Sequence, residues 1–195
     1  MNWKVLIFVG LVAYGAFHHY SHRAVMHGAG EIAPQEPLQT NTNVSDIQLK
    51  GFTLTPLANY AVQARVLSRE DYAFGTEAEL SPTDLALGWG PMSDEAILSQ
   101  IDISQGNRFF FWRVEKFPIA QRNIETHAAN THIIPANRLV ENQLEDVRAG
   151  QLVRLKGLLV EVKRADGWHW RSSLSREDTG AGACEILYVT ELSVH

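Results

Sequence analysis

The polar-aromatic pattern of this sequence is its strongest signal for a binding site. Two of the five tryptophans are directly followed by arginine, as Trp112-Arg113 and Trp170-Arg171. A guanidinium beside aromatic rings can hold a peptide, a glycan or a lipid headgroup. The same rings can instead seal a small core, with each arginine paired to a nearby acid. The candidate ligand-binding residues are Trp89, Arg113, His132, Trp170 and Arg171.

His132 also belongs to the nucleophilic arrangement that the residue types allow. Cys184 is the only cysteine, and a Cys184–His132 pair with Asn130 or Asp94 as the orienting group would be chemically competent. A carboxylate could take the place of the thiol. The chain has no GxSxG sequence, and nothing in the sequence itself brings these groups together. A hydrolase is therefore the alternative to a binding domain, and the catalytic residues stay unassigned.

The eight histidines do not follow a metal-binding pattern. His127 and His132 are five residues apart, which would place them about 140° apart on a helix. The chain has neither an HExxH nor a CxxC sequence. The remaining cluster lies beside the apolar N-terminal run rather than on a rigid scaffold: His18, His19, His22 and His27. We expect no metal and no cofactor.

Composition narrows the class of protein. The chain has 195 residues, of which 45% are hydrophobic and 20% charged, as is usual for a globular protein. Its formal net charge is −5, without the concentrated basic charge that neutralises phosphates, so we expect no nucleic-acid partner. A single cysteine cannot form an intramolecular disulfide.

Hydrophobic periodicity and turn residues predict the elements that must position these side chains. Strands are predicted over residues 52–55, 60–67, 101–103, 108–115, 151–162, 168–174 and 185–192. Helices are predicted over residues 81–87, 94–100 and 138–147, the last one capped by Asn137. Residues 118–135 fit either a helix or irregular structure. Asp166-Gly167 predicts a hairpin turn, and Gly157 interrupts a long strand as glycine does at sharp bends.

The sum is a strand-dominated α+β fold with short helices. Its element order is compatible with a small, partly open β-barrel of the OB or SH3-like kind, preceded by one N-terminal hydrophobic helix. We expect residues 1–23 to be a membrane anchor or signal segment, residues 24–48 a flexible linker, and residues 49–195 one extracytoplasmic domain. The linker is inferred from a composition rich in Gly, Pro, Thr, Asn and Gln.

The N-terminal segment leaves two interpretations open. The apolar run Val5–Phe17 would span about 20 Å as a helix, against roughly 30 Å for the hydrocarbon core of a membrane. Trp3 and Tyr20 bracket this run, and no formally charged residue lies between Lys4 and Arg23. Both observations favour an uncleaved signal-anchor. A cleaved signal peptide is the alternative.

Four longer motifs carry a resemblance to a known group. They are LSPTDLALGWGPMSD (80–94), RFFFWRVE (108–115), NTHIIPAN (130–137) and DGWHWRSSLSREDTGAGACE (166–185). With them the chain resembles a family of small bacterial proteins with a hydrophobic N-terminus, described as hypothetical. The resemblance covers roughly residues 49–192. It implies a bacterial envelope protein of unknown activity, and it brings no catalytic residues with it.

The sequence thus predicts a membrane-tethered extracytoplasmic binding or assembly domain rather than an enzyme. Its predicted location is the bacterial inner membrane, crossed once, with the C-terminal domain in the periplasm. The predicted partners are the membrane, through the N-terminal helix, and another envelope protein.

Overall fold

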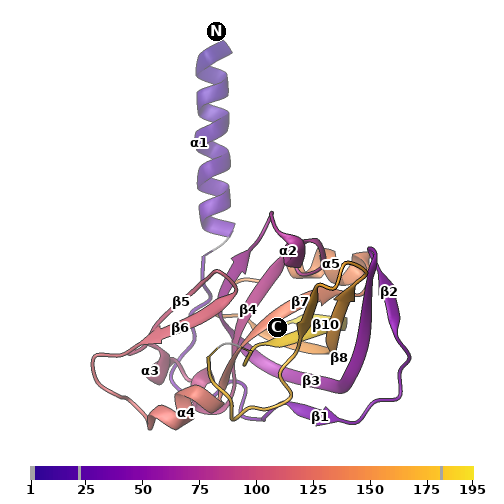
Figure 1. Cartoon of the computed structure of the whole chain (residues 1–195). Coiled ribbons are helices and arrows are strands. Elements are labelled where there is room, and N and C mark those ends of the chain that lie inside the picture. Colours follow the sequence, from indigo (N-terminus) through magenta and orange to yellow (C-terminus); the bar gives the residue numbers. More distant parts are fainter. Residues whose placement is uncertain (1–2, 22, 181) are drawn as a thin grey trace.

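A computed structural model describes residues 3–21, 23–180 and 182–195 of the chain (Figure 1). The fold is strand-dominated α+β, as the sequence predicts. Its helices are α1 (Trp3–Ser21), α2 (Thr76–Leu80), η1 (Gly90–Ser93), α3 (Glu95–Leu98), α4 (Gln121–Thr126) and α5 (Arg138–Glu145). Its strands are β1 (Leu38–Thr40), β2 (Ile47–Leu49), β3 (Phe52–Asp71), β4 (Thr83–Gly88), β5 (Asp102–Gly106), β6 (Phe109–Arg113), β7 (Ala128–Pro135), β8 (Leu152–Arg164), β9 (His169–Arg171) and β10 (Glu185–Val194).

The main sheet closes on itself. The long strand β3 pairs with β8 along residues 52–65 and with β4 along residues 65–71. β4 then pairs with β7, β7 with β10, and β10 with β8, which completes a ring. Within this ring the β7–β10 pair is parallel and the other pairs are antiparallel. Because neighbouring strands cover each other's edges, the ring hides the polar backbone groups that an open sheet would expose.

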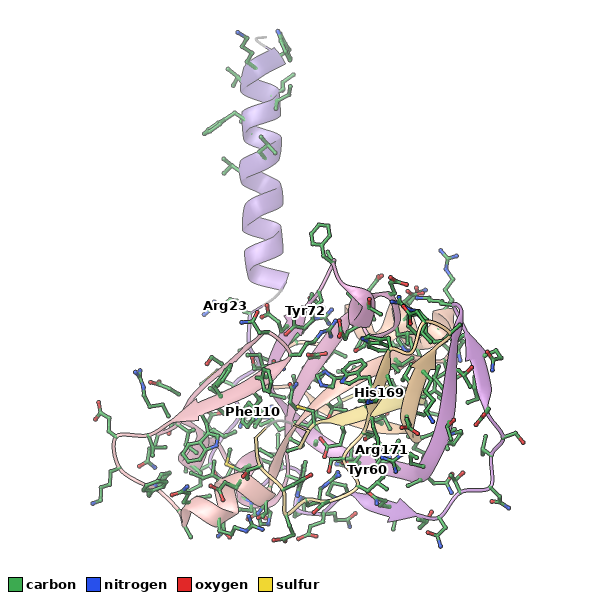
Figure 2. The ribbon with its side chains drawn as sticks, in the orientation of Figure 1. Arg23, Tyr60, Tyr72, Phe110, His169 and Arg171 are labelled. Atoms are coloured by element: carbon green, nitrogen blue, oxygen red, sulfur yellow. The ribbon has the colours of Figure 1, made fainter. Side chains whose placement is uncertain are left out.

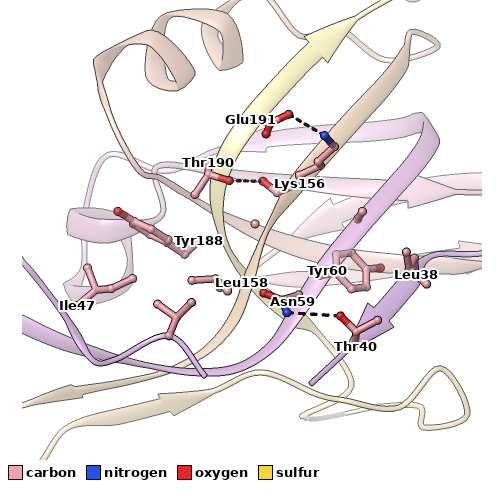
Figure 3. A pocket seen from close by; sticks show the side chains of 13 residues that line it. Leu38, Thr40, Ile47, Asn59, Tyr60, Lys156, Leu158, Tyr188, Thr190 and Glu191 are labelled. Carbon is pink, nitrogen blue, oxygen red and sulfur yellow. Dashed lines mark hydrogen bonds and ion pairs between the residues drawn. The ribbon is translucent and has the colours of Figure 1, made fainter. Parts of the chain in front are cut away.

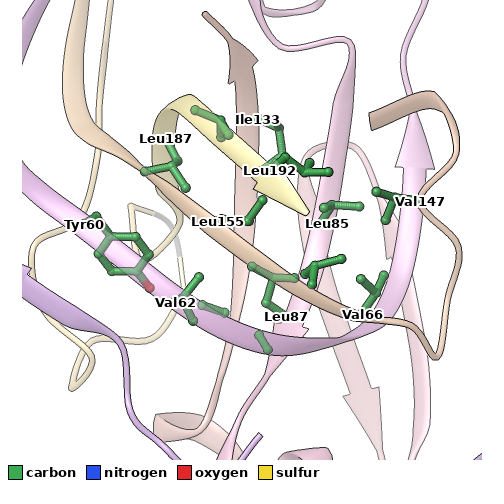
Figure 4. Close-up of a cluster of buried hydrophobic side chains, with 14 of the residues drawn as sticks. Tyr60, Val62, Val66, Leu85, Leu87, Ile133, Val147, Leu155, Leu187 and Leu192 are labelled. Atoms are coloured by element: carbon green, nitrogen blue, oxygen red, sulfur yellow. The ribbon is translucent and has the colours of Figure 1, made fainter. Parts of the chain in front are cut away.

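Apolar side chains fill the inside of the ring (Figure 4). They come from alternate positions of the ring strands, as the two-residue period of a strand requires. The helix α5 contributes Val140 and Leu144 to the same core. Asn137 begins this helix as predicted, since its side-chain oxygen accepts a hydrogen bond from the backbone N–H of Val140 at 3.1 Å.

Gly157 lies where β8 bends most closely against its neighbour β10. Its register partners are Tyr60 on one side and Val189 on the other, next to an irregularity in the β8–β10 pairing. A Cβ atom on Gly157 would lie 2.0 Å from the carbonyl oxygen of Tyr188. Glycine is therefore required here for the close approach of two backbones, whereas the sequence suggested a sharp bend of the strand.

A second apolar cluster lies between α2, β7, β10 and the extended ends of β3 and β8. Trp168 and Trp170 pack against it from the β9 side, with ring centroids 6.2 Å apart. They share one face of the strand while His169 and Arg171 are exposed, as their alternation predicts. The turn that returns β8 to β9 contains Gly167 with φ +94°, in agreement with the predicted hairpin.

The connection from β4 to β7 folds into a small lobe of its own. It holds η1, α3, the β5–β6 hairpin and α4, and its centre is formed by Met92, Ile101 and Ile124 with Trp112 packed against them. In Figure 1 the hairpin lies alongside β4, at one side of the ring. Residues 118–135, predicted as a helix or irregular structure, contain the short helix α4, but residues 128–135 form the ring strand β7, which neither alternative included.

The predicted helix over residues 81–87 is wrong. Ser81, Pro82 and Asp84 have the residue types of a helix start, but the structure forms the strand β4 there, and every residue of β4 is buried. A strand enclosed on both faces has no polar alternation that would identify it from the sequence. Pairing with β3 and β7 outweighs the local helix signal.

Residues 24–48, expected as a flexible linker, lie against the folded region. The backbone N–H of Val25 donates to the carbonyl of Ala149 at 2.8 Å, and His27 bonds the carbonyl of Gly150 at 2.7 Å. Ala33 is 1% exposed. The strands β1 and β2 then pair with β3. The composition of this segment is polar, but its backbone groups find partners on the domain.

The N-terminal helix α1 stands apart from the strands (Figure 1). Among the described residues, no helix combines the length and the apolar character needed to cross a membrane. This finding contradicts the predicted transmembrane signal-anchor, and with it the predicted single-pass location in the inner membrane. The apolar run within α1 is short for that role, at about 20 Å. Met1, Asn2 and His22 of the predicted segment 1–23 lie outside the described residues.

Candidate functional site

Three of the five predicted site residues lie apart from one another. Trp89 is 1% exposed and belongs to the apolar core inside the ring. Arg113 lies at the end of β6 with an exposed side chain that pairs with Asp102 at 2.8 Å. Arg171 on β9 is also exposed and pairs with Glu161 at 3.2 Å (Figure 2). For these three residues the structural role foreseen as the alternative is the one observed.

The other two predicted residues, His132 and Trp170, do come together. Their ring centroids are 4.5 Å apart. His132 lies on β7 with its side chain 2% exposed, and Trp170 reaches it from the β9 hairpin that folds over this part of the ring. The contact places an imidazole beneath an aromatic ring on the outer face of β7.

Asp84 on β4 is the direct strand neighbour of His132. The two residues are register partners in the β4–β7 pair, and Nδ1 of His132 lies 2.9 Å from Oδ1 of Asp84. The side chain of Asp84 is completely buried. A buried carboxylate is costly unless charged partners or hydrogen bonds compensate it.

Arg108, at the tip of the β5–β6 hairpin, supplies that compensation. Its Nη1 atom donates to Oδ1 of Asp84 at 2.7 Å. The guanidinium lies 3.7 Å from the centre of the Tyr72 ring and 5.9 Å from that of Trp170, and the backbone N–H of Arg108 donates to the Tyr72 hydroxyl at 2.9 Å. We call Asp84, Tyr72, His132 and Trp170 the Arg108 cage.

The cage leaves polar atoms without partners. Among the described residues, Oδ2 of Asp84 and Nη2 of Arg108 are buried and have no hydrogen-bond partner. Nδ1 of His132 is close to Asp84 but off the direction of a good hydrogen bond. Each such group costs about 1–3 kcal/mol of desolvation, and more when it is charged. Unpaired buried polar atoms are few in native proteins, and a bound water, a bound ion or a functional role accounts for many of them.

Asn130 and Cys184 extend the polar network on the far side of Arg108. The side-chain amide of Asn130 accepts a hydrogen bond from Gln105 at 2.6 Å and donates to the Arg108 carbonyl at 3.0 Å. The Cys184 thiol lies 3.8 Å from that same carbonyl. Burial raises the pKa of Cys184 to about 11, so the thiol is protonated at neutral pH and is a poor nucleophile.

A cavity of about 140 Å³ opens beside Asn130. It lies between the β5–β6 hairpin and the loop that precedes β10, with the floor formed by the start of β7. Phe109, Phe110 and Trp112 supply aromatic walls, and Glu125 and Asp178 supply carboxylates. Its lining residues include neither lysine nor arginine. Figure 2 shows Phe110 on the hairpin side of the molecule.

A second buried charge lies at the start of β10. Glu185 is 1% exposed and points into the ring, where its Oε1 atom pairs with Nη1 of Arg176 at 2.8 Å. The same Arg176 nitrogen donates to the Tyr60 hydroxyl at 3.1 Å. Burial raises the pKa of Glu185 to about 7, against the lowering effect of Arg176, and Asp178 raises it further.

A larger, mainly apolar cavity of about 500 Å³ lies elsewhere, where residues 38–47 cross the outer face of β3, β8 and β10 (Figure 3). Leu38, Ile47, Leu158 and Tyr188 are among its lining residues. None of the residues of the Arg108 cage lines it. Several of its polar side chains pair within the chain, as in the Lys156–Glu191 ion pair at 2.9 Å.

No family model, no curated protein and no solved structure matches the chain. Among the described residues there is also no group of three or more His, Cys, Asp or Glu side chains that could hold a metal ion.

Sequence reasoning missed Asp84, Arg108 and Tyr72. The available signal for Asp84 was its position directly before the apolar run Leu85–Gly88. An acid is also common in the first turn of a helix, and the helix predicted there accounted for Asp84 without a functional role. Arg108 was placed inside a strand, whereas Asn107 and Arg108 form the two-residue turn. The pairing of β4 with β7 brings Asp84 to His132, whereas Arg108 comes from the β5–β6 turn and Tyr72 directly follows β3.

Proposed function

We propose that this chain is a non-enzymatic binding domain, and that its ring of strands is a small barrel of the OB kind. In chain order the ring strands are β3, β4, β7, β8 and β10, and they close in the order β3-β4-β7-β10-β8. Barrels of this kind bind their ligands on the face of the second and third strands, flanked by the loops that join strands one to two and four to five. Here those strands are β4 and β7.

The observation that carries the proposal is the buried polar group on this face. Asp84, Arg108 and His132 meet on the outer side of β4 and β7, with unpartnered atoms, beside an open cavity. A fold by itself does not give a function. A charged cluster next to a cavity with aromatic walls is an arrangement typical of ligand-binding sites.

The charge of the cavity indicates the class of ligand. Glu125 and Asp178 line it, and its lining has no basic residue to offer an anion. The chain as a whole carries a formal charge of −5. We therefore propose a neutral or cationic polypeptide segment as the ligand, and not an oligonucleotide.

Panning a random peptide library against the full chain tests the proposal. Selected peptides should lose about tenfold or more in affinity for Phe110→Ser, because Phe110 walls the cavity. The matched control is Phe111→Ser, which removes the neighbouring, 53% exposed ring on the same strand. It should leave affinity unchanged. If no peptide distinguishes the two variants, the proposed binding face is wrong.

The hydrolase alternative gains one observation, the approach of His132 to the Asp84 carboxylate. Against it, His132 is 2% exposed under Trp170, and the Cys184 thiol is kept protonated by burial. General-base chemistry needs the imidazole within about 3 Å of a reacting proton in a substrate complex. We therefore favour the binding domain.

A further inference from the structure

Arg108 occupies a site that the rest of the protein builds for a cation. Asp84 provides a fully buried carboxylate, and Tyr72 provides a ring face 3.7 Å from the guanidinium carbon. The centre of the Trp170 ring lies 5.9 Å from the same carbon. An acid combined with aromatic faces is the chemistry by which proteins recognise guanidinium and alkylammonium groups. Asp84 uses its Oδ1 atom for Arg108, and its buried Oδ2 atom has no hydrogen-bond partner.

The residue that fills this site comes from a tight two-residue turn. Asn107 and Arg108 have φ values of +51° and +69°, and they connect the register partners Gly106 and Phe109 of β5 and β6. Two-residue hairpin turns of type I′ require a positive φ at both central residues. The hairpin itself therefore sets this backbone conformation, and it places Arg108 at the tip from which its side chain reaches Asp84.

The cage and the cavity at Asn130 adjoin each other. The backbone carbonyl of Arg108 accepts a hydrogen bond from Asn130, and the next residue, Phe109, already lines the cavity. A chain segment lying in the cavity therefore meets the hairpin tip at Arg108. The carboxylates of Glu125 and Asp178 lie at this surface, where Glu125 pairs with Arg122 at 3.7 Å and Asp178 accepts a hydrogen bond from Ser173 at 2.6 Å.

We propose that the Arg108 cage is a recognition site for the guanidinium group of a ligand, and that Arg108 is an internal substitute which the ligand displaces. The inference rests on the proposed function, because it names the ligand chemistry at the same face. The chain is autoinhibited in the form described: the ligand's arginine must compete with a tethered arginine of the protein itself.

Agmatine, a small guanidinium compound, is the direct probe of this site. Titrated into the full-length Arg108→Ala variant at constant ionic strength, it should bind saturably and shift one tryptophan indole N–H signal in the NMR spectrum. The wild type should bind it about tenfold or more weakly, since its site is mostly occupied by Arg108. Arg113→Ala, which removes an exposed arginine from the same hairpin, should behave as the wild type.

Two further variants make the result decisive. Asp84→Asn in the Arg108→Ala background should lower agmatine affinity about tenfold, because the carboxylate is lost. If Arg108→Ala does not fold alone, Arg108→Gln retains an amide donor for Asp84, and agmatine should raise the folded fraction of either variant. Absence of saturable binding, or equal binding by the Asp84→Asn double variant, would overturn the inference. So would failure of both variants to fold at any agmatine concentration.

The source of the guanidinium is resolved by a second arm. An arginine-containing peptide from the library should bind the wild type more tightly than agmatine does, and it should lose this advantage in Phe110→Ser. Peptides that depend on Phe110 but not on arginine would leave the binding domain standing and refute the guanidinium site. Agmatine binding without any Phe110-dependent peptide would refute the polypeptide ligand instead.

Discussion

In the part of the chain that the structure describes, the carboxyl groups of Asp84 and Glu185 are buried, and each meets a different arginine. Asp84 meets Arg108, which comes from an inserted hairpin, and Glu185 meets Arg176, which comes from the loop before β10. Both carboxylates are buried, so removal of either arginine should lower the free energy of unfolding. Breaking a buried pair typically loses about 3–5 kcal/mol, because a charge is left without compensation.

Glu185 should make the stability of the protein pH-dependent. Burial raises its pKa from 4.5 to about 7, so the folded state binds this proton more tightly than the unfolded state does. The resulting stabilisation is complete below about pH 4.5 and is lost as the pH rises through about 7. Relative to Glu185→Gln, the wild type should lose roughly 3 kcal/mol of unfolding free energy over that interval.

Urea unfolding of both proteins at about pH 4.5, 6 and 7.5 measures this difference. Glu185→Gln is the control for the wild type, because it keeps the shape of the side chain but does not titrate. Parallel pH profiles for the two proteins would show that Glu185 titrates normally in the folded state.

At the scale of elements, the close approach of β8 to β10 allows a sharp test. Gly157→Ala should destabilise the protein by roughly 2–3 kcal/mol, because the new methyl group would meet the Tyr188 carbonyl oxygen and force the strands apart. Gly106→Ala, with no atom within 4 Å of the new Cβ, is the matched control and should change stability by less than about 1 kcal/mol. Urea denaturation of the two variants gives the comparison, and equal losses would contradict the assignment.

The elements that the sequence predicted well are those with a local cause. Asn137 caps α5 through its own side chain, Gly167 turns the β8–β9 hairpin, and alternation marks β8. The prediction for β4 was wrong because this strand is buried on both faces and begins with residues typical of a helix start. The prediction of the site missed Asp84 for a related reason. Asp84 and His132 become neighbours through strand pairing between residues 48 positions apart, which no local pattern encodes.

At the scale of the whole molecule, residues 24–37 should act as a structural part of the domain. Deletion of residues 1–22 removes α1, whose described side chains are exposed, and should leave the thermal midpoint within about 2 °C. Deletion of residues 1–37 also removes buried Ala33 and the hydrogen bonds to Ala149, Gly150 and Ser93. At about 1 kcal/mol for each bond, the midpoint should fall by roughly 6–12 °C.

Thermal unfolding followed by circular dichroism compares the two deletions. Urea unfolding checks that each transition remains cooperative. A deletion of residues 1–37 that melts with the shorter deletion would mean that the segment contributes nothing to the domain.

The parallel pairing of β7 with β10 determines when the ring of strands can close during folding. β10 comes last among the ring strands in chain order, yet it is the strand that joins β7 to β8. Until β10 arrives, β7 and β8 each carry an unpaired edge, and residues of the inner core face an open groove. Contacts between distant parts of a chain form late and slowly. A ribosome-bound chain lacking β10 therefore carries two edges open to other strands, so the synthesis of this protein is the period in which it is most exposed to aggregation.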